Sequence, residues 1–365
     1  MVTIKVLHAA VLSDASIGII KQMQSEKNAA KLLEIPWSTF IHVPENFEEN
    51  VVFQHKINSK NKILRYIKLR SAFYTWLTKE IKTHDIVLLR YSTYDPFQTL
   101  ICFLFGKKIL TVHHTKESEE IIASKGKIFG KILNCFEYIF GKITIKSVSG
   151  LIAVTEEILH FEKLRRGKKP IKNLIYPNGI LFQKKAHSDK RKVDPELLFM
   201  AGSFANWHGL DMLFDSLVEN NDKFLLHIVG DTEQSIKNKV KNDNRIIFHG
   251  KLKQKEIDVL MCHVWCGLSS FALHRQGMHE ACTLKVREYL MSGLPVYSGH
   301  NDSALPIDFP YYKVGKPDIT MILRYAEEMR DVKKSIVSQS AEQFISKERL
   351  LQDLYMKISK QYNIN

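Results

Sequence analysis

The segment from Arg275 to Val296 (RQGMHEACTLKVREYLMSGLPV) holds side chains whose types and spacing could do chemistry. Glu280 and Glu288 are separated by seven residues. Thr283 is a residue type that caps helix N-termini, so the pattern predicts a helix from Leu284 to Met291. Glycine at position 293 would end that helix, and a strand would follow Pro295.

The loop that precedes this expected helix is suited to binding an anion. Between Glu280 and Thr283 it would present backbone N–H groups beside a helix N-terminus, which together favour a diphosphate. Glu288, about one turn into the helix, could accept hydrogen bonds from both hydroxyls of a ribose. The alternative is a solvated helix with ordinary charged side chains.

The rest of the chain alternates short apolar runs with amphipathic segments, of which Ile17–Leu33 is an example. The runs that we expect to form buried strands are Ile4–Ala10, Asp85–Arg90, Lys108–Val112, Leu151–Val154, Leu174–Tyr176, Leu197–Ala201, Phe224–Val229, Arg245–Phe248, Val264–Leu268 and Leu294–Tyr297. Strands that alternate with helices predict parallel βαβ units and an α/β fold.

The lysine-rich stretch Lys184–Lys192 separates two such series and is a candidate linker. We therefore expect two doubly wound domains, over residues 1–180 and 181–340. A C-terminal helix within 341–365 could pack back on the first domain. Two such domains facing each other would form a central cleft at the carboxyl ends of both sheets. Neither a G-x-G-x-x-G after a strand nor a P-loop sequence is present, which argues against those two ways of binding phosphate.

The segment with the paired glutamates resembles the Glu-x7-Glu signature of the retaining glycosyltransferases of family 4, which have the two-domain GT-B fold. The run TLKVREYLMSGLPV is similar to the capsule- and O-antigen-type members. Further similar stretches follow in the family's order: LIAVTEEI from Leu151, YPNGI from Tyr176, FMAGSFANWHGLDML from Phe199, LHIVGD from Leu226 and RIIFHG from Arg245. The resemblance covers roughly residues 150–300.

The resemblance implies roles for these residues. Glu288 would hold the ribose of a nucleotide-diphosphate sugar, and Glu280 would hold hydroxyls of the transferred sugar. The diphosphate would lie against backbone amides of Ala281, Cys282, Thr283 and Leu284. In this family the departing phosphate is thought to help deprotonate the acceptor, so no enzyme nucleophile is required. No Asp-x-Asp metal motif of the other major glycosyltransferase fold is present, and we expect neither a metal nor a cofactor besides the nucleotide sugar as co-substrate.

One departure from the family concerns its Arg and Lys that clamp the diphosphate. Here Gly202 is followed by Ser203, and His208 stands where the lysine is expected. Either the clamp has moved or activity is lost. Arg275 and Lys285 flank the expected anion loop and are candidate replacements, unless they are surface charges.

The first half of the chain offers candidates for the acceptor side or a phosphate loop. Ser16 and Gly18 lie at the turn after the first expected strand, where glycine would let the backbone approach a ligand. His113 and His114 follow the expected strand Lys108–Val112 at its carboxyl end. By resemblance, an acceptor-side histidine belongs here, and we favour His114 as the catalytic one. The alternatives are a plain strand–helix turn and structural histidines.

Charge is distributed unevenly along this basic chain, which has a net charge of +14. Residues 1–180 carry 27 basic and 16 acidic side chains, a net of +11, against +3 for the remainder. Basic residues alternate with apolar ones over Lys60–Lys82 and Lys125–Lys146. Both stretches would suit an anionic membrane surface, although ordinary helices packing on a sheet give the same pattern. Nucleic-acid binding is not expected, because no recognised module accompanies the charge.

The cellular location is expected to be cytoplasmic, with peripheral attachment to the inner face of the cell membrane. The longest strongly apolar stretch, Leu100–Phe105, is far below the roughly 20 residues that span a bilayer. Val2–Leu12 is typical of a first strand rather than a signal peptide. The five cysteines are scattered, and Cys262 and Cys266 lack a second ligand pair for zinc.

Together these features predict a retaining, hexosyltransferase-type glycosyltransferase that extends a glycan, or a lipid-linked glycan, in cell-surface polysaccharide synthesis. Two alternatives stay open: a sugar-nucleotide epimerase of the same fold, and a non-catalytic subunit that binds nucleotide or glycan.

Overall fold

A computed structural model describes residues 4–13, 16–44, 51–55, 57, 60–116, 121, 127–183 and 190–362. The chain divides into two compact units. Unit 1 comprises Met1–Leu181 together with Lys347–Asn365, and unit 2 comprises Phe182–Ser346. Most of the expected linker, residues 184–189, lies outside the described residues.

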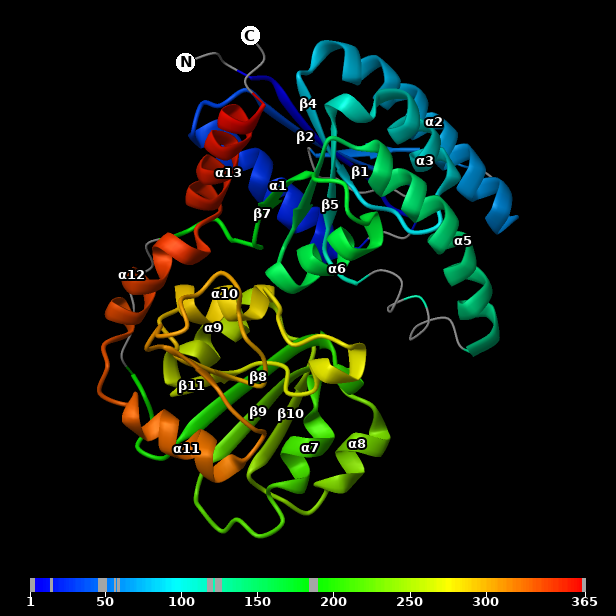
Figure 1. Ribbon diagram of the computed structural model, residues 1–365. Coiled ribbons are helices and arrows are strands. Elements are labelled where there is room, and N and C mark those ends of the chain that lie inside the picture. Colours follow the sequence, from blue (N-terminus) through cyan, green and yellow to red (C-terminus); the bar gives the residue numbers. More distant parts are fainter. Residues whose placement is uncertain are drawn as a thin grey trace. The chain divides into compact units, whose positions relative to one another are not determined.

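Unit 1 contains, in its described part, a seven-stranded sheet of order β3-β2-β1-β4-β5-β6-β7 (Figure 1). All its strand pairs are parallel. Its strands are β1 (Val6–Val11), β2 (Trp37–Val43), β3 (Val52–Gln54), β4 (Ile86–Arg90), β5 (Ile109–His113), β6 (Gly150–Ala153) and β7 (Lys172–Ile175). Its helices are α1 (Ile17–Leu32), α2 (Lys62–Thr83), α3 (Pro96–Phe105), α5 (Lys127–Ser147), α6 (Glu156–Arg166) and α13 (Lys347–Gln361). The chain order reverses between β1 and β4, and open α/β sheets bind ligands at such a switch point.

Helices cover both faces of this sheet. On one face, α1 and α13 share a hydrophobic core with alternate strand residues such as Leu88, through Ala29, Leu354 and Ile358. On the other face lie α2, α3 and α5, side by side (Figure 1). The last described helix, α13, therefore completes the core of unit 1.

Unit 2 has a six-stranded parallel sheet in the order β10-β9-β8-β11-β12-β13, counted over the residues described. The strands are β8 (Glu196–Ser203), β9 (Leu225–Asp231), β10 (Ile246–Gly250), β11 (Cys266–Leu268), β12 (Val296–Ser298) and β13 (Tyr312–Val314). The helices are α7 (Leu210–Asp215), α8 (Gln234–Lys239), α9 (Gln254–His263), α10 (Leu284–Met291), α11 (Ile319–Glu328) and α12 (Lys334–Ile345). Here the switch point lies between β8 and β11, and α10 connects β11 to β12.

The doubly wound α/β architecture predicted for both halves is confirmed, and each predicted apolar run overlaps a strand. Three strands were missed: β2, β3 and β13. Thr39 and His42 are buried on opposite faces of β2, and these polar residues interrupt its apolar pattern. The other two have three residues each, too few for any periodicity to be visible. Within the described residues, no helix has the length and hydropathy needed to cross a bilayer.

Candidate functional site

The predicted helix at residues 284–291 is confirmed as α10, and it follows a well-defined turn. Gly293, with φ of 77°, lies just beyond the helix, and β12 begins at Val296. Thr283 occupies the N-cap position with φ of −80° and ψ of 141°, but its side chain makes no capping hydrogen bond within the described residues. Its Oγ1 is buried and forms no hydrogen bond to any described residue. The expected cap is therefore absent, and this hydroxyl is left for another partner.

The loop before α10 is fixed by the segment that follows β12. The Ala281 amide donates to the Asn301 carbonyl at 3.0 Å, and the Asn301 amide donates to the His279 carbonyl at 3.1 Å. Glu280 lies half-buried in this loop and pairs with Asn301 as an isolated β-bridge. The Ala281 amide therefore already has an acceptor, whereas Cys282, Thr283 and Leu284 stay the predicted amide ligands of a diphosphate.

Buried side chains reinforce the same junction. Arg287 and Asp302, both fully buried, form a two-pronged ion pair in which Arg287 Nη2 donates to Asp302 Oδ1 at 2.8 Å. The Cys282 sulfur lies 3.2 Å from Ser303 Oγ. Burial, with the nearby Asp302 charge, raises the pKa of the Cys282 thiol to about 12, so it stays protonated and unreactive. Only the backbone of Cys282 is then suited to contact a ligand.

Lys285 carries a buried charged group beside the same junction. Its Nζ is buried, makes no hydrogen bond to any described residue, and lies 5.2 Å from the centre of the Phe199 ring. Burial lowers the pKa of Lys285 to about 7, against the opposing effect of the Glu288 carboxylate. Glu288 is half-buried and lies three residues further along the same helix, as expected. An amine in this state gains from any anion placed next to it.

The charge of Lys285 helps to lower the pKa of two histidines, His208 and His300. Burial first, and Lys285 second, lower the pKa of His208 to about 3. Because the Ala205 amide donates to His208 Nδ1 at 2.9 Å, the neutral ring carries its proton on Nε2 and can donate from there. His208 was predicted for its position in the sequence, and the structure brings it near Lys285.

His300 and Ser269 were not predicted. His300 Nδ1 donates to the Ser270 carbonyl at 2.9 Å, which leaves Nε2 as an acceptor, and that atom is buried without a hydrogen bond within the described chain. Burial lowers the pKa of His300 to about 4, and Lys285 contributes in the same direction. The Ser269 hydroxyl is likewise buried and forms no hydrogen bond to the residues described. Both residues closely follow predicted strands, and this position near the carboxyl end of a strand is the sequence feature that could have identified them as site residues.

The other predicted donor residues differ in availability. Arg275, in the 3-10 helix η3 (Leu273–Gln276), donates through both Nη atoms to Asp211 at 2.9 and 2.7 Å and to the Asn206 carbonyl at 2.8 Å. Because its guanidinium makes these bonds, Arg275 links η3 to Asn206 and to Asp211 on α7. Gly202 and Ser203 are exposed at the end of β8, and a Cβ at Gly202 would meet no described atom within 4 Å.

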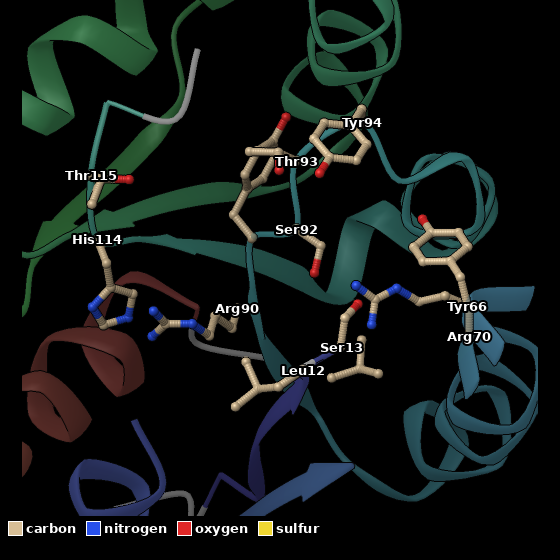
Figure 2. A pocket seen from close by; sticks show the side chains of 12 residues that line it. Leu12, Ser13, Tyr66, Arg70, Arg90, Ser92, Thr93, Tyr94, His114 and Thr115 are labelled. Carbon is tan, nitrogen blue, oxygen red and sulfur yellow. The ribbon is translucent and has the colours of Figure 1, made fainter. Parts of the chain in front are cut away.

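Unit 1 has a cavity of about 510 Å³ at the switch point of its sheet (Figure 2). Its walls come from the carboxyl ends of β1, β4 and β5 and from α2. The lining residues are Val11, Leu12, Ser13, Tyr66, Arg70, Arg90, Tyr91, Ser92, Thr93, Tyr94, His114 and Thr115.

Of the two predicted histidines, only His114 lines this cavity. Burial, with the charge of Arg90, holds the pKa of His114 well below its usual range, and its Nε2 is buried without a hydrogen bond to a described residue. His113 is not among the lining residues: its ring is fully buried, stacks on Tyr91 at 4.5 Å, and lies 2.9 Å from Thr111 Oγ1. Successive strand residues face opposite sides of a sheet, which explains the difference.

Ser16 and Gly18 lie at the start of α1 and are both exposed. Ser16 occupies the N-cap position, but its side chain makes no capping hydrogen bond to the described residues. A Cβ at Gly18 would have no described atom within 4 Å, so the local backbone does not require glycine. No group of three or more histidine, cysteine, aspartate or glutamate side chains suited to a metal occurs among the residues described.

Comparison with known proteins gives similarity at the level of structure. No family model matches the chain, and no curated protein matches it by sequence. Among solved structures, the lipopolysaccharide outer core galactosyltransferase WaaB is 15% identical, over 98% of this chain and 99% of that one, with a TM-score of 0.65. HepE of Anabaena, in complex with UDP and glucose, is 13% identical over 98% and 100%, with a TM-score of 0.67.

A protein described as a UDP-N-acetylglucosamine 2-epimerase, from Listeria monocytogenes, is also similar: it is 13% identical over 98% of this chain and 97% of that one, with a TM-score of 0.58. Identities this low establish the architecture and leave the activity open. With two Rossmann-like units on parallel sheets and similarity along nearly its whole length, this chain has the GT-B fold.

Proposed function

We propose that this chain is a retaining glycosyltransferase that moves a hexose from a nucleotide-diphosphate sugar to a glycan acceptor in cell-surface polysaccharide synthesis. The fold is shared with a lipopolysaccharide galactosyltransferase and with a protein that binds UDP and glucose, which supports this class of reaction. The resemblance around Glu280 and Glu288 supports retention of the anomeric configuration.

The observation that carries the proposal is the buried Nζ of Lys285 at the start of α10, which has no hydrogen-bond partner within the described chain. A buried amine of this kind is unfavourable alone and favourable beside an anion. The α10 N-terminus adds positive potential, and Thr283 Oγ1 is a second buried group in need of a partner. A diphosphate meets all three requirements.

The remaining groups then take definite roles. Lys285 and the Nε2–H of neutral His208 meet the diphosphate in place of the family's basic clamp, while Arg275 positions the loop that carries His208. Glu288 holds the ribose, and Glu280 holds the transferred sugar. In unit 1, neutral His114 faces the acceptor, whose proton passes to the departing phosphate as the new glycosidic bond forms.

We further propose that the acceptor is lipid-linked and is met at an anionic membrane. Three neighbouring helices of unit 1 expose large apolar side chains: Ile63, Leu64 and Ile67 on α2, Leu100, Phe103 and Leu104 on α3, and Ile132, Phe136, Tyr138, Ile139 and Ile143 on α5. We call this set the apolar surface. The exposed side chains of Lys62 and Lys68 lie on one of these helices, α2. Exposed apolar residues together with basic ones are typical of a surface that rests on anionic lipid. Of the second basic stretch, Lys125 lies outside the described residues, as does the side chain of Lys127.

Glu288 provides the direct test. Glu288→Ala should weaken binding of UDP-glucose by about 1.5–3 kcal/mol, since it removes hydrogen bonds from ribose hydroxyls to a charged group. Isothermal titration calorimetry on the full chain measures this, with the exposed Glu219→Ala in the same unit as the control. Equal affinities for both variants would remove Glu288 from the site.

Product analysis separates the proposal from its alternatives. Incubation with a panel of nucleotide sugars and glycan acceptors should give an extended glycan and free nucleotide diphosphate. Conversion to the epimeric sugar without an acceptor would instead indicate the epimerase, and binding without turnover would indicate a non-catalytic subunit.

A further inference from the structure

We infer that the cavity of unit 1 binds an oxyanion, a phosphate or carboxylate carried by the acceptor, and that Arg70 is its direct ligand. The inference rests on the proposed function insofar as it takes the occupant to be the acceptor. It deepens that function by naming the substrate class: an acidic or phosphorylated glycan.

Arg70 comes from α2 and is 6% exposed. Its Nε lies 2.8 Å from Asp95 Oδ2. Asp95 has further partners: its Oδ1 accepts from the amides of Phe97 and Gln98 at 3.0 and 3.1 Å, and its Oδ2 accepts from the Tyr74 hydroxyl at 3.1 Å. Asp95 therefore caps α3 and holds only one edge of the Arg70 guanidinium.

The other edge of that guanidinium has donors to spare. Arg70 Nη1 is buried and makes no hydrogen bond to any described residue. Figure 2 shows the guanidinium reaching from α2 between Ser13 and Ser92, with Arg90 and His114 together on the opposite side. A guanidinium presents its donors in a planar fork that matches two oxygens of a phosphate or carboxylate.

The surroundings favour an anion over a neutral ligand. The cavity has a second cation, Arg90, and none of its described lining residues is acidic. The ring of Tyr66 lies 5.0 Å from the centre of the Arg70 guanidinium. Burial raises the pKa of Tyr66 to about 12, with Asp95 acting in the same direction, so the hydroxyl stays protonated and can donate. The cavity therefore offers hydrogen-bond donors on the side of Arg70 and Tyr66 and on the side of Arg90.

The loop after β4 is held in place before any ligand arrives. Tyr94 has φ of 43°, a conformation that is unfavourable for a bulky side chain. Buried Glu137 fixes it, because Glu137 accepts from the Tyr94 amide and from the Tyr91 hydroxyl at 2.6 Å each. The Ser92 amide donates to Gln98 Oε1 at 3.0 Å. Strain held by a buried carboxylate beside a cavity is typical of a preorganised binding site.

The test titrates the full chain by calorimetry with glucose 6-phosphate, with glucuronate, and with methyl glucoside as the neutral reference. We expect one or both acids to bind and the neutral sugar to bind at least about tenfold more weakly. Arg70→Gln should lower the affinity for the acid by about 10- to 150-fold. Lys79→Gln, which removes one exposed positive charge from the same helix, should leave the affinity within about twofold.

A second variant guards against a folding defect in Arg70→Gln. Ser13 is exposed and lines the cavity, so Ser13→Asp adds a negative charge without disturbing a core. It should weaken binding of the acid by about tenfold through charge repulsion. The acid that binds identifies phosphate or carboxylate as the group. The inference is overturned if the acids and methyl glucoside bind with equal affinity. It is also overturned if wild type, Arg70→Gln and Ser13→Asp bind the acid with equal affinity.

UDP-glucose, titrated into the same proteins and into Lys285→Met, separates this inference from the proposed function. If both hold, Lys285→Met loses UDP-glucose and keeps the acid, whereas Ser13→Asp does the reverse. Loss of the acid in Lys285→Met, with retention in Arg70→Gln, would place the oxyanion in unit 2 and contradict the inference alone. If the wild type binds the acid but none of the nucleotide sugars in the panel, UDP-glucose included, the proposed function alone is contradicted.

Discussion

Two basic residues near α10 show how the surroundings of a single charge decide its use. Arg275 has both Nη atoms bonded to Asp211, and that hydrogen bonding raises the pKa of Arg275 above its ordinary value. Lys285 has a buried Nζ without a hydrogen bond to any described residue. The sequence analysis predicted both residues as ligands of the diphosphate. It could not separate them, because spacing in the sequence does not show which carboxylate a basic side chain will contact in the folded chain.

The pH dependence of donor binding tests Lys285. Its pKa in the free protein is lowered to about 7 by burial, so at pH 8 most molecules carry a neutral amine. A diphosphate favours the charged amine, and binding should therefore take up a proton above pH 7. The affinity for UDP-glucose should fall by up to about tenfold per pH unit between pH 7 and 8.5. Calorimetry at pH 8 in two buffers of different ionisation enthalpy measures the proton uptake.

Lys285→Met is the control for that experiment, since it has no proton to gain and its weaker binding should be independent of pH over this range. Lys285 also affects stability. Its folded pKa lies below the value near 10.4 of an unfolded lysine, so the free energy of unfolding should rise with pH between about 7 and 10. Proton uptake that persists in Lys285→Met would show that another group is responsible.

The helices and strands were more predictable than the contacts between their side chains. The bounds of α10 could be predicted because Thr283 and Gly293 are local signals. The long helix α5 was harder to predict, because it contains glycines. The reason for Gly141 is tertiary: a Cβ there would lie 2.4 Å from Glu137 Oε1 and 2.5 Å from the Tyr91 hydroxyl. This glycine makes room for the buried network that fixes the loop beside the cavity, which no local pattern could reveal.

The apolar surface of α2, α3 and α5 should bind anionic vesicles. Replacing Lys62, Arg65 and Lys68 together by Glu should weaken binding to phosphatidylglycerol vesicles by at least about 3 kcal/mol, at about 1 kcal/mol per basic residue. Phe103→Glu should also weaken it, because an exposed ring would no longer enter the lipid. Vesicle co-sedimentation at low and high salt measures both effects, and salt should weaken wild-type binding.

The matched control is Val218→Glu, which adds a charge at a highly exposed apolar position in unit 2. It should bind vesicles as wild type does. If the control and Phe103→Glu lose binding equally, net charge alone accounts for the effect, and the apolar surface is then an ordinary solvent-exposed helix face.

At the scale of the whole molecule, the chain builds unit 1, then unit 2, and returns to unit 1 for its last helix. The two series of strands were visible in the sequence as apolar runs on either side of a lysine-rich stretch. The site could be predicted only in part. Lys285, Glu288 and His114 lie in informative motifs, whereas Arg70 and His300 acquire their meaning from partners far away in the sequence, Asp95 and Ser270.

This division into units predicts two separable thermal transitions. Leu354, on α13, is 1% exposed and packs in the core of unit 1, so Leu354→Ala should destabilise that unit by about 2–5 kcal/mol. Val337, on α12, is fully buried in unit 2. Val337→Ala should lower the other transition only. UDP-glucose at about 100 times its dissociation constant should raise the unit 2 transition by about 2.7 kcal/mol of stability and leave the unit 1 transition in place. Differential scanning calorimetry resolves the two, and a single transition that moves with either substitution and with the ligand would show that the units unfold as one.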